Sequence, residues 1–249
     1  MRYFLKLSYR GTRYHGWQRQ PNGLSVQEVL ETALTTVLRE PVALVGSGRT
    51  DAGVHAGQQF AHFDTEMSLP PALMQSLNSL IPGDVAVQAC FPVCPDDHAR
   101  FTAMFRYYQY QVIRQKDPFR EGLAYVFTRP VDVSRMNLAA ECLLRYRDFE
   151  SFSKVKTDVT TFNCRIDFAY WEEKSTGDLT FHIRADRFLR GMVRAIVGTL
   201  LAVGQGWLNV AEFEQIIEAK DRKRAGRAVP PAGLSLVEVG YPAELFSRR

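Results

Sequence analysis

The sequence SVQEVLETALTTVL, residues 25–38, predicts the helix on which the first half of the fold is built. From Val26, apolar residues recur at i, i+3, i+4, i+7, i+8, i+11 and i+12, which places them on one helix face. Ser25 and Glu28 match a capping box, in which the hydroxyl and the carboxylate satisfy each other's free backbone amides. Pro41 closes the pattern, so the stretch predicts an amphipathic helix with defined ends.

Strand patterns lie on both sides of this helix. Strands are expected at residues 2–9, 42–47, 58–64 and 85–93. A Gly-rich turn, residues 46–57, joins the second and third strands, and a second helix opens at Pro70-Pro71 and stops at Pro82-Gly83. The order β-α-β-β-α-β predicts a split βαβ sheet with helices on one face.

A similar order of elements begins near residue 101. Strands are expected at residues 105–114, 163–171, 179–185 and 234–239, and helices at 134–144, 188–203 and 210–220. The sequence therefore predicts an α+β fold of two split-βαβ (RRM/ferredoxin-like) halves with mainly antiparallel sheets. The halves are expected at residues 1–100 and 101–249, meeting at a central catalytic cleft.

Composition excludes several classes of protein. The chain has 249 residues, of which 46% are hydrophobic and 23% charged, so a disordered or fibrous protein is not expected. No stretch reaches eighteen consecutive apolar residues, and the alternating start of the chain does not resemble a signal peptide, so we expect a cytoplasmic protein with no membrane contact. The four cysteines form no C-x-x-C pair and are expected to be buried and reduced.

Basic side chains gather in three segments, residues 1–25, 184–194 and 220–227, although the net charge is only +4. Each segment has almost no acidic residue between its cations. Such clusters suit a polyanionic partner, and the alternative is a set of solvated surface loops.

The turn GSGRTDAGVHA, residues 46–56, carries one acidic residue, Asp51, between Gly48 and Gly53. Glycines let a backbone adopt positive φ or approach a ligand closely. The turn lacks the P-loop pattern. Asp51 could act chemically, could ligate a metal together with His55 and His62, or could accept backbone amides in a tight structural turn.

In the second half, a predicted helix and a predicted strand carry further candidate functional residues. The predicted helix 188–203 is apolar over most of its circumference, yet Arg187, Arg190 and Arg194 recur at i, i+3 and i+7. A guanidinium against such a helix needs an acidic partner or an anionic ligand, unless it only snorkels to the surface.

In the predicted strand 106–110, Tyr108 shares a face with Arg106. This position fits either stacking on a base or packing in the core.

The loop YRGTRYHGWQRQ, residues 9–20, interleaves aromatic, basic and amide side chains with no acid. Such a loop can hold a phosphate backbone and pack on bases, or it can be a plain surface loop.

Taken together, these motifs resemble the tRNA pseudouridine synthase A (TruA-like) family. The stretch GRTDAGVHA at 48–56 resembles its catalytic motif. Further matches, in the family's order, are YHGWQRQ at 14–20, SVQ at 25–27, ARF at 99–101 with Arg106, Tyr108 and Tyr110, FLR at 188–190 with Met192, Val193 and Arg194, AKDR at 219–222, and Pro230 with Gly233-Leu234.

The resemblance implies an enzyme that isomerises uridine to pseudouridine at nucleotides 38, 39 and 40 of the tRNA anticodon stem-loop. It implies no cofactor, no metal and a homodimer. It also implies roles for single residues: Asp51 as the catalytic nucleophile, Arg194 as its basic partner, and Tyr108, Arg49 and Leu234 as substrate-binding residues. Arg49 would enter the space that the extruded base leaves.

The residue chemistry agrees with these implied roles. A carboxylate can attack the sugar or take a sugar proton, and a nearby guanidinium keeps such a carboxylate ionised in a closed pocket. We expect the tRNA backbone to be held by basic residues outside the pocket. They are Arg10, Arg13, Arg19, Lys220, Arg222, Lys223, Arg224 and Arg227. The competing hypotheses are a non-catalytic RNA-binding module and a metal-dependent hydrolase.

Overall fold

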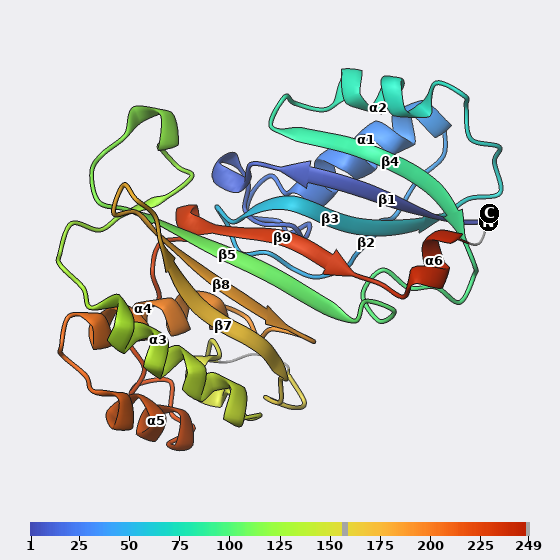
Figure 1. Cartoon of the computed structure of the whole chain (residues 1–249). Coiled ribbons are helices and arrows are strands. Elements are labelled where there is room, and N and C mark those ends of the chain that lie inside the picture. Colours follow the sequence, from blue (N-terminus) through green and yellow to red (C-terminus); the bar gives the residue numbers. More distant parts are fainter. Residues whose placement is uncertain (156–158, 248–249) are drawn as a thin grey trace. The chain divides into compact units, whose positions relative to one another are not determined.

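The computed structural model describes residues 1–155 and 159–247, which contain nine strands and six α-helices (Figure 1). They form two compact units. Unit 1 comprises Met1–Met104 with Leu236–Arg249, and unit 2 comprises Phe105–Ser235. The end of the chain thus groups with unit 1, whereas the sequence pattern assigned it to the second half. The mixed α+β class with mainly antiparallel strands is confirmed.

The strands of unit 1 follow the order β4-β1-β3-β9, with the short strand β2 paired to β3, and the first two residues of β9, Leu234 and Ser235, belong to unit 2. Their bounds are β1 (Arg2–Tyr9), β2 (Val45–Gly46), β3 (His55–Asp64), β4 (Val85–Val93) and β9 (Leu234–Gly240). The central strand β1 runs antiparallel to both β3 and β4. The predicted strand 42–47 is therefore reduced to the two residues of β2, which lie just before the loop that contains Asp51.

Helices pack on both faces of the unit 1 strands, over one of them only in part. The helices of this unit are α1 (Val26–Leu38), α2 (Leu73–Leu80) and the short C-terminal α6 (Ala243–Ser247). Phe4, which alternation places among the polar residues of β1, is fully buried and packs edge-on against Tyr241 at 5.6 Å between ring centroids. Tyr241 in turn packs against Phe246 of α6. The prediction of helices on one face is incomplete for unit 1, because α6 and Tyr241 cover the part of the second face that carries Phe4 and Phe60.

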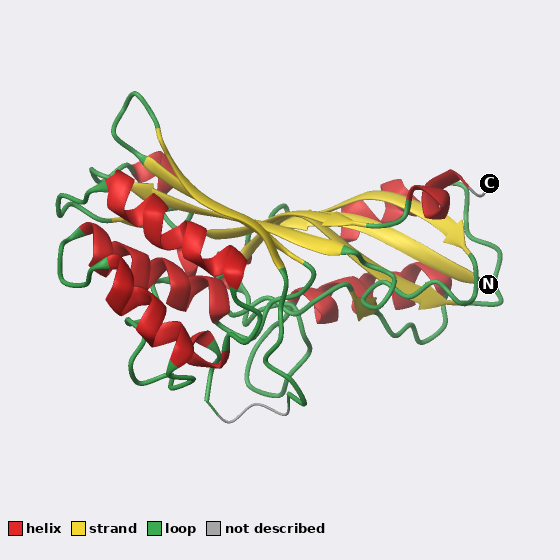
Figure 2. Ribbon diagram, turned by 60° about the horizontal axis from the view of Figure 1, so that its bottom comes forward, coloured by secondary structure: helices red, strands yellow, loops and turns green. Residues whose placement is uncertain are grey.

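Unit 2 has the antiparallel strand order β5-β8-β7, with β6 parallel to β5. The strands are β5 (Phe105–Ile113), β6 (Tyr125–Val126), β7 (Ile166–Glu173) and β8 (Leu179–Ala185). The helices are α3 (Val133–Cys142), α4 (Met192–Gly204) and α5 (Val210–Glu218). Figure 2 shows these three helices on one face of the unit 2 strands, as predicted.

Helix α4 begins four residues later than the periodicity predicts. Gly191 adopts φ +72° at its N-cap, a left-handed conformation that suits glycine, so Phe188–Arg190 precede the helix. Within the described part of the chain, no helix is both long and apolar enough to span a bilayer. Of the four free cysteines, Cys142 and Cys164 are buried, whereas the other two are only half-buried.

One buried histidine of unit 1 makes stability depend on pH. Burial, followed by the charges of Arg2 and His98, lowers the pKa of His62 from 6.5 to about 4. His62 Nδ1 accepts a hydrogen bond from the Ala99 amide at 3.1 Å. Between pH 6.5 and 4 the unfolded chain binds a proton that the folded chain does not, so the free energy of unfolding falls as the pH drops through this window.

We expect His62 to contribute about 2 kcal/mol to the difference in unfolding free energy between pH 7 and pH 4.5. Urea unfolding of the wild type and of His62→Gln, at both pH values, measures it. The variant should lose less stability on acidification than the wild type, because glutamine still offers an acceptor to Ala99 and does not titrate. An equal loss in both proteins would contradict this assignment.

Candidate active site

The predicted catalytic residue Asp51 lies in the loop between β2 and β3 of unit 1. Its carbonyl accepts the Val54 amide at 3.1 Å, which closes a tight turn in which Gly53 adopts φ +79°. The neighbouring Thr50 is buried, whereas Asp51 is half-buried and Arg49 is exposed. The loop thus presents the carboxylate and the guanidinium while anchoring the residue between them.

The anchor of this loop is the segment that follows β1. The Trp17 amide donates to the Thr50 carbonyl at 3.2 Å, and the Gly53 amide donates to the Tyr14 carbonyl at 3.2 Å. The hydroxyls of Tyr9 and Thr50 share a buried hydrogen bond of 2.9 Å. Asp51 is therefore held by backbone bonds on both sides and by a side-chain bond at Thr50.

The aromatic residues of that segment support the site and do not lie at the surface. Tyr9, Tyr14 and Trp17 are all buried in unit 1. The expectation that this loop packs its aromatic residues on bases is wrong for these three side chains. The alternative of a plain surface loop does not describe these three side chains either, because they are buried and help to fix the Asp51 loop.

Gly16 is a supporting residue that the sequence motifs did not single out. It adopts φ +90°, and a Cβ there would lie 2.4 Å from the Thr50 carbonyl oxygen. Only glycine permits this approach of the two loops. A usable signal was present in the sequence, since this glycine stands between His15 and Trp17 in a segment crowded with large side chains.

One acidic residue, Asp84, holds Arg13 and Tyr14 of the segment that follows β1. Asp84 accepts hydrogen bonds from Arg13 Nε and from the Tyr14 hydroxyl, each at 2.6 Å. The Arg13 hydrogen bond is the largest cause that lowers the pKa of Asp84. Burial, followed by the bond to Asp84, raises the pKa of Tyr14 to about 12. Asp84 is thus ionised at neutral pH and ties the segment to the start of β4.

The histidines proposed as metal ligands make structural hydrogen bonds. His55 Nδ1 accepts the Gly11 amide at 3.0 Å, and His62 Nδ1 accepts the Ala99 amide. Among residues 1–155 and 159–247, no group of three His, Cys, Asp or Glu side chains is arranged to hold a metal ion.

In unit 2, Tyr108 lies on β5 and is buried. Its ring packs edge-on against Phe188, with 5.2 Å between the centroids and 89° between the planes. Alternation along β5 is as predicted: Tyr107 points to the other face, where its hydroxyl hydrogen-bonds His182 at 2.6 Å. Arg106 donates to the Asp186 carbonyl at 2.9 Å, which ties β5 to the loop before α4.

Arg194 is the arginine of the predicted stripe that lies on α4. Arg187 and Arg190 precede the helix, so the expected helical stripe of three is wrong. Arg194 Nε donates to the Val229 carbonyl at 2.7 Å, and the Val229 amide donates back to the Arg194 carbonyl at 3.1 Å. This two-way contact fixes the direction in which the half-buried guanidinium leaves the helix.

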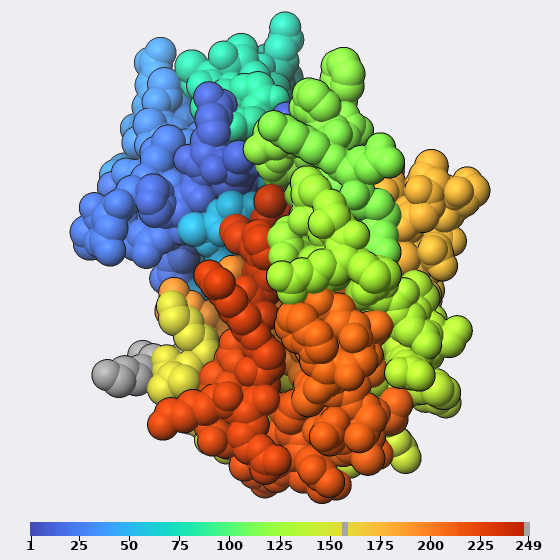
Figure 3. All heavy atoms as spheres, turned by 90° about the vertical axis from the view of Figure 1, so that its left-hand side faces the viewer, coloured from blue at the N-terminus to red at the C-terminus, as the bar shows by residue number. Residues whose placement is uncertain are grey.

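The segment 221–230 follows α5 and runs along the surface of unit 2 (orange-red in Figure 3). Two glycines let it lie against α4: a Cβ on Gly198 would meet the Arg227 carbonyl oxygen at 1.9 Å, and the Gly226 amide donates to Thr199 Oγ1 at 2.9 Å. The segment continues into Leu234, a buried residue at the start of β9.

The predicted phosphate-binding residues fall into three groups. Arg13, Arg19 and Lys220 pair with acidic side chains: Arg13 with Asp84 at 2.6 Å, Arg19 with Glu31 at 3.6 Å and Glu28 at 3.9 Å, and Lys220 with Asp148 at 2.8 Å. Arg222 donates to backbone carbonyls of its own segment. The remaining four, Arg10, Lys223, Arg224 and Arg227, are exposed, as are Arg13, Arg19 and Lys220.

Unit 1 therefore contains an anchored carboxylate with an exposed arginine two residues before it, and unit 2 contains a buried tyrosine and an oriented arginine. A carboxylate in a fixed loop can act as a nucleophile or a base. An aromatic ring and guanidinium groups can bind a planar base and an anion.

Comparison with known proteins identifies the family. A family model described as tRNA pseudouridine synthase matches residues 7–101 and 139–242. A tRNA pseudouridine synthase A of Porphyromonas gingivalis is 52% identical over 249 residues, which cover 98% of this chain and 99% of that protein. The tRNA pseudouridine synthase A of Parabacteroides distasonis is 52% identical, and the match covers 98% of this chain and 98% of that protein. The one of Exiguobacterium sibiricum is 41% identical, and the match covers 97% of this chain and 97% of that protein. The chain belongs to the tRNA pseudouridine synthase family.

Proposed function

We propose that this protein isomerises uridine to pseudouridine in tRNA, at nucleotides 38, 39 and 40 of the anticodon stem-loop. The reaction breaks the bond between N1 of uracil and C1′ of the ribose, rotates the uracil, and forms a bond from C5 to the same carbon. A proton leaves C5 and one is gained at N1, so the reaction is redox-neutral. The observation that carries the proposal is the anchored, glycine-flanked Asp51 in a chain of this family.

Asp51 is the proposed catalytic nucleophile. It attacks C1′ as uracil departs, or it takes a sugar proton, and either step requires the ionised carboxylate. Arg194 is its proposed basic partner, since a guanidinium opposes the cost of an ionised acid in a closed pocket. The hydrogen bonds of Thr50 and Gly53, on either side of Asp51, support the role of Asp51, because a nucleophile must be held at its reaction distance.

Tritium release tests the proposed reaction. In tRNA carrying [5-³H]uridine, formation of the new C5 bond releases the label into water. We expect release by the wild type in the presence and in the absence of EDTA. No release would contradict the proposed function, and release abolished by EDTA would favour a metal-dependent reaction.

Tyr108 is proposed to lie beneath the target uracil, with Arg49 in the space that the extruded base leaves and Leu234 lining the pocket. Extruding a base from a stem costs a few kcal/mol, which stacking offsets. Tyr108→Ala should reduce turnover by about 10²-fold, because stacking on an aromatic ring contributes about 1–3 kcal/mol. Single-turnover rates measure this, with Tyr108→Phe as the variant that keeps the ring. Wild-type rates in the alanine variant would show that Tyr108 only packs the core.

The tRNA backbone is proposed to be held by the eight basic residues named above. Arg224→Gln should flatten the dependence of log affinity on log salt by about 0.9 or less, because one phosphate contact is lost. Arg13→Gln should flatten it less, since Arg13 must leave Asp84 to reach a phosphate. Filter binding over a salt series measures both slopes. An unchanged slope in Arg224→Gln would remove the segment 221–230 from the interface.

We further propose that the protein acts as a homodimer in the cytoplasm. The resemblance to the family supports this. Sedimentation equilibrium over a range of concentrations tests the oligomeric state directly.

A further inference from the structure

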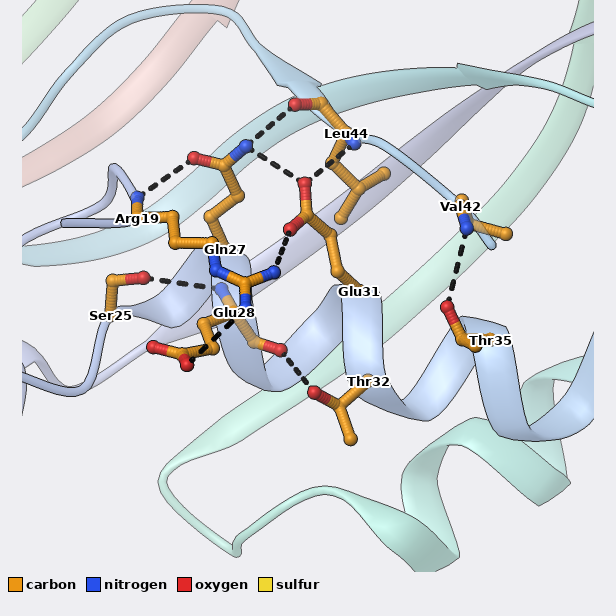
Figure 4. A network of polar contacts seen from close by, with 9 residues as sticks. All are labelled: Arg19, Ser25, Gln27, Glu28, Glu31, Thr32, Thr35, Val42 and Leu44. Atoms are coloured by element: carbon orange, nitrogen blue, oxygen red, sulfur yellow. Dashed lines mark hydrogen bonds and ion pairs between the residues drawn. The ribbon is translucent and has the colours of Figure 1, made fainter. Parts of the chain in front are cut away.

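The segment that leads to Asp51 is bonded to β3 over only a short stretch. Val45 and Gly46 pair with β3, and the Ser47 amide donates to the Phe60 carbonyl of β3 at 2.7 Å, whereas Leu44 just before them is 3% exposed and is bonded to side chains. A buried backbone amide and carbonyl need hydrogen-bond partners, and leaving them without any is costly. The partners of Leu44 come from side chains of α1 (Figure 4).

Three polar residues of α1 lie at i, i+4 and i+8, on one face of the helix, and act as the missing strand. Gln27 Nε2 donates to the Leu44 carbonyl at 2.9 Å, and Glu31 Oε1 accepts the Leu44 amide at 2.9 Å. One turn further on, Thr35 Oγ1 accepts the Val42 amide at 3.2 Å. Figure 4 shows Gln27 and Glu31 side by side against Leu44.

The two central side chains are also joined to each other and to the loop that contains Arg19. Gln27 Nε2 donates to Glu31 Oε1 at 2.9 Å, while Gln27 Oε1 accepts the Arg19 amide at 3.0 Å. Glu31, which is 8% exposed, has Arg19 Nη1 at 3.6 Å from its other oxygen. Every polar atom of the Gln27 amide group thus has a partner on a different segment.

From Leu44 the contacts continue to the catalytic loop, which is the loop between β2 and β3 that contains Asp51. A Cβ on Gly46 would lie 2.4 Å from Trp17 Nε1, so the strand packs directly on that ring. Ser47 and Gly48 are both bonded to the side chain of Gln59, and Thr50 is bonded to Tyr9. A displacement of Leu44 is therefore passed along a short, packed backbone toward Asp51.

We propose that Gln27 and Glu31 are positioning residues for the nucleophile, holding the strand that leads to Asp51 by taking the place of an absent neighbouring strand. The proposal rests on the proposed function and adds two residues to it. They act through the backbone of Leu44, and a misplacement of the catalytic group by about 1 Å costs about 10²-fold in rate.

Four variants test the proposal. Glu31→Ala removes the acceptor, whereas Glu31→Gln keeps an oxygen for the Leu44 amide and loses the charge beside Arg19. Gln27→Glu keeps the shape but turns two donated bonds into contacts between oxygens. Thr32→Ala is the matched control, because Thr32 is exposed on the same helix and bonds only the Glu28 carbonyl among the contacts drawn in Figure 4.

The readouts are single-turnover pseudouridine formation at saturating enzyme, tRNA affinity, and hydrogen exchange of the Leu44 and Leu5 amides. Glu31→Ala and Gln27→Glu should slow the chemical step by about 10- to 100-fold with tRNA affinity within about twofold. Exchange at Leu44 should rise in Glu31→Ala while exchange at Leu5 in β1 stays slow, which marks local opening without global unfolding. Glu31→Gln and Thr32→Ala should behave as the wild type.

Two results would overturn the proposal. One is a normal chemical step in Glu31→Ala with faster exchange at Leu5 as well as Leu44, since Glu31 would then contribute only to global stability. The other is a Glu31→Gln variant as slow as Glu31→Ala, since the charge would then matter and not the bond to Leu44. Failure of the wild type to form pseudouridine would instead reject the proposed function, and the exchange at Leu44 would still report the local contact.

Discussion

Asp51→Asn should abolish pseudouridine formation while leaving tRNA binding intact. The substitution keeps the size of the side chain and removes its charge, so the anchored turn around Thr50 and Gly53 should persist. Loss of a catalytic nucleophile typically costs several orders of magnitude, and we expect a fall of at least about 10³-fold in the single-turnover rate. The rate of tritium release at saturating enzyme measures it.

The control for this variant is Asp84→Asn, which changes another acidic residue of unit 1 that supports the segment after β1. It should lower stability more than it lowers the chemical step. Near-normal turnover by Asp51→Asn would contradict the assignment of the nucleophile, even if the family assignment stands.

Arg194→Met should slow the chemical step by about 10²-fold, the usual effect of removing one group that stabilises charge at a reaction centre. Methionine keeps much of the side-chain volume on α4 and cannot donate to the Val229 carbonyl. We therefore also expect a loss of about 1–2 kcal/mol in the free energy of unfolding. Denaturant unfolding separates this loss from the kinetic effect.

Arg194→Lys is the informative companion, because it keeps the positive charge but loses the directed Nε–H bond to Val229. An intermediate rate is expected. A wild-type rate in Arg194→Met would remove Arg194 from the reaction and leave it only the role of fixing the segment 221–230 to α4.

Much of the fold follows from local sequence patterns. Helix α1 occupies residues 26–38 as its apolar period and its Ser25 cap predict, and Ser25 Oγ accepts the Glu28 amide at 3.2 Å. Strand β8 likewise has the predicted bounds. Helix α6 was missed, and so was the burial of Phe4 beneath Tyr241, because that burial depends on residues more than 200 positions apart.

The site shows the same division. Asp51 is recognisable because its glycines and neighbours form a contiguous motif. The supporting role of Tyr14 and Trp17 is not visible in sequence, since it arises from pairing with Thr50 and Gly53 across the fold. Gln27 and Glu31 look like the solvated face of an amphipathic helix, although their period of four was present in the sequence.

Conversion of uridine to pseudouridine in the anticodon stem-loop of tRNA is the reaction that we assign to this protein. It is tested most directly by nucleoside analysis of unmodified tRNA after incubation with the wild type, with each of nucleotides 38, 39 and 40 as the only uridine among the three. We expect that one uridine is lost for each pseudouridine gained, with the mass and length of the tRNA unchanged. A cleaved tRNA, or an unchanged nucleoside composition under conditions where the tRNA is bound, would contradict it.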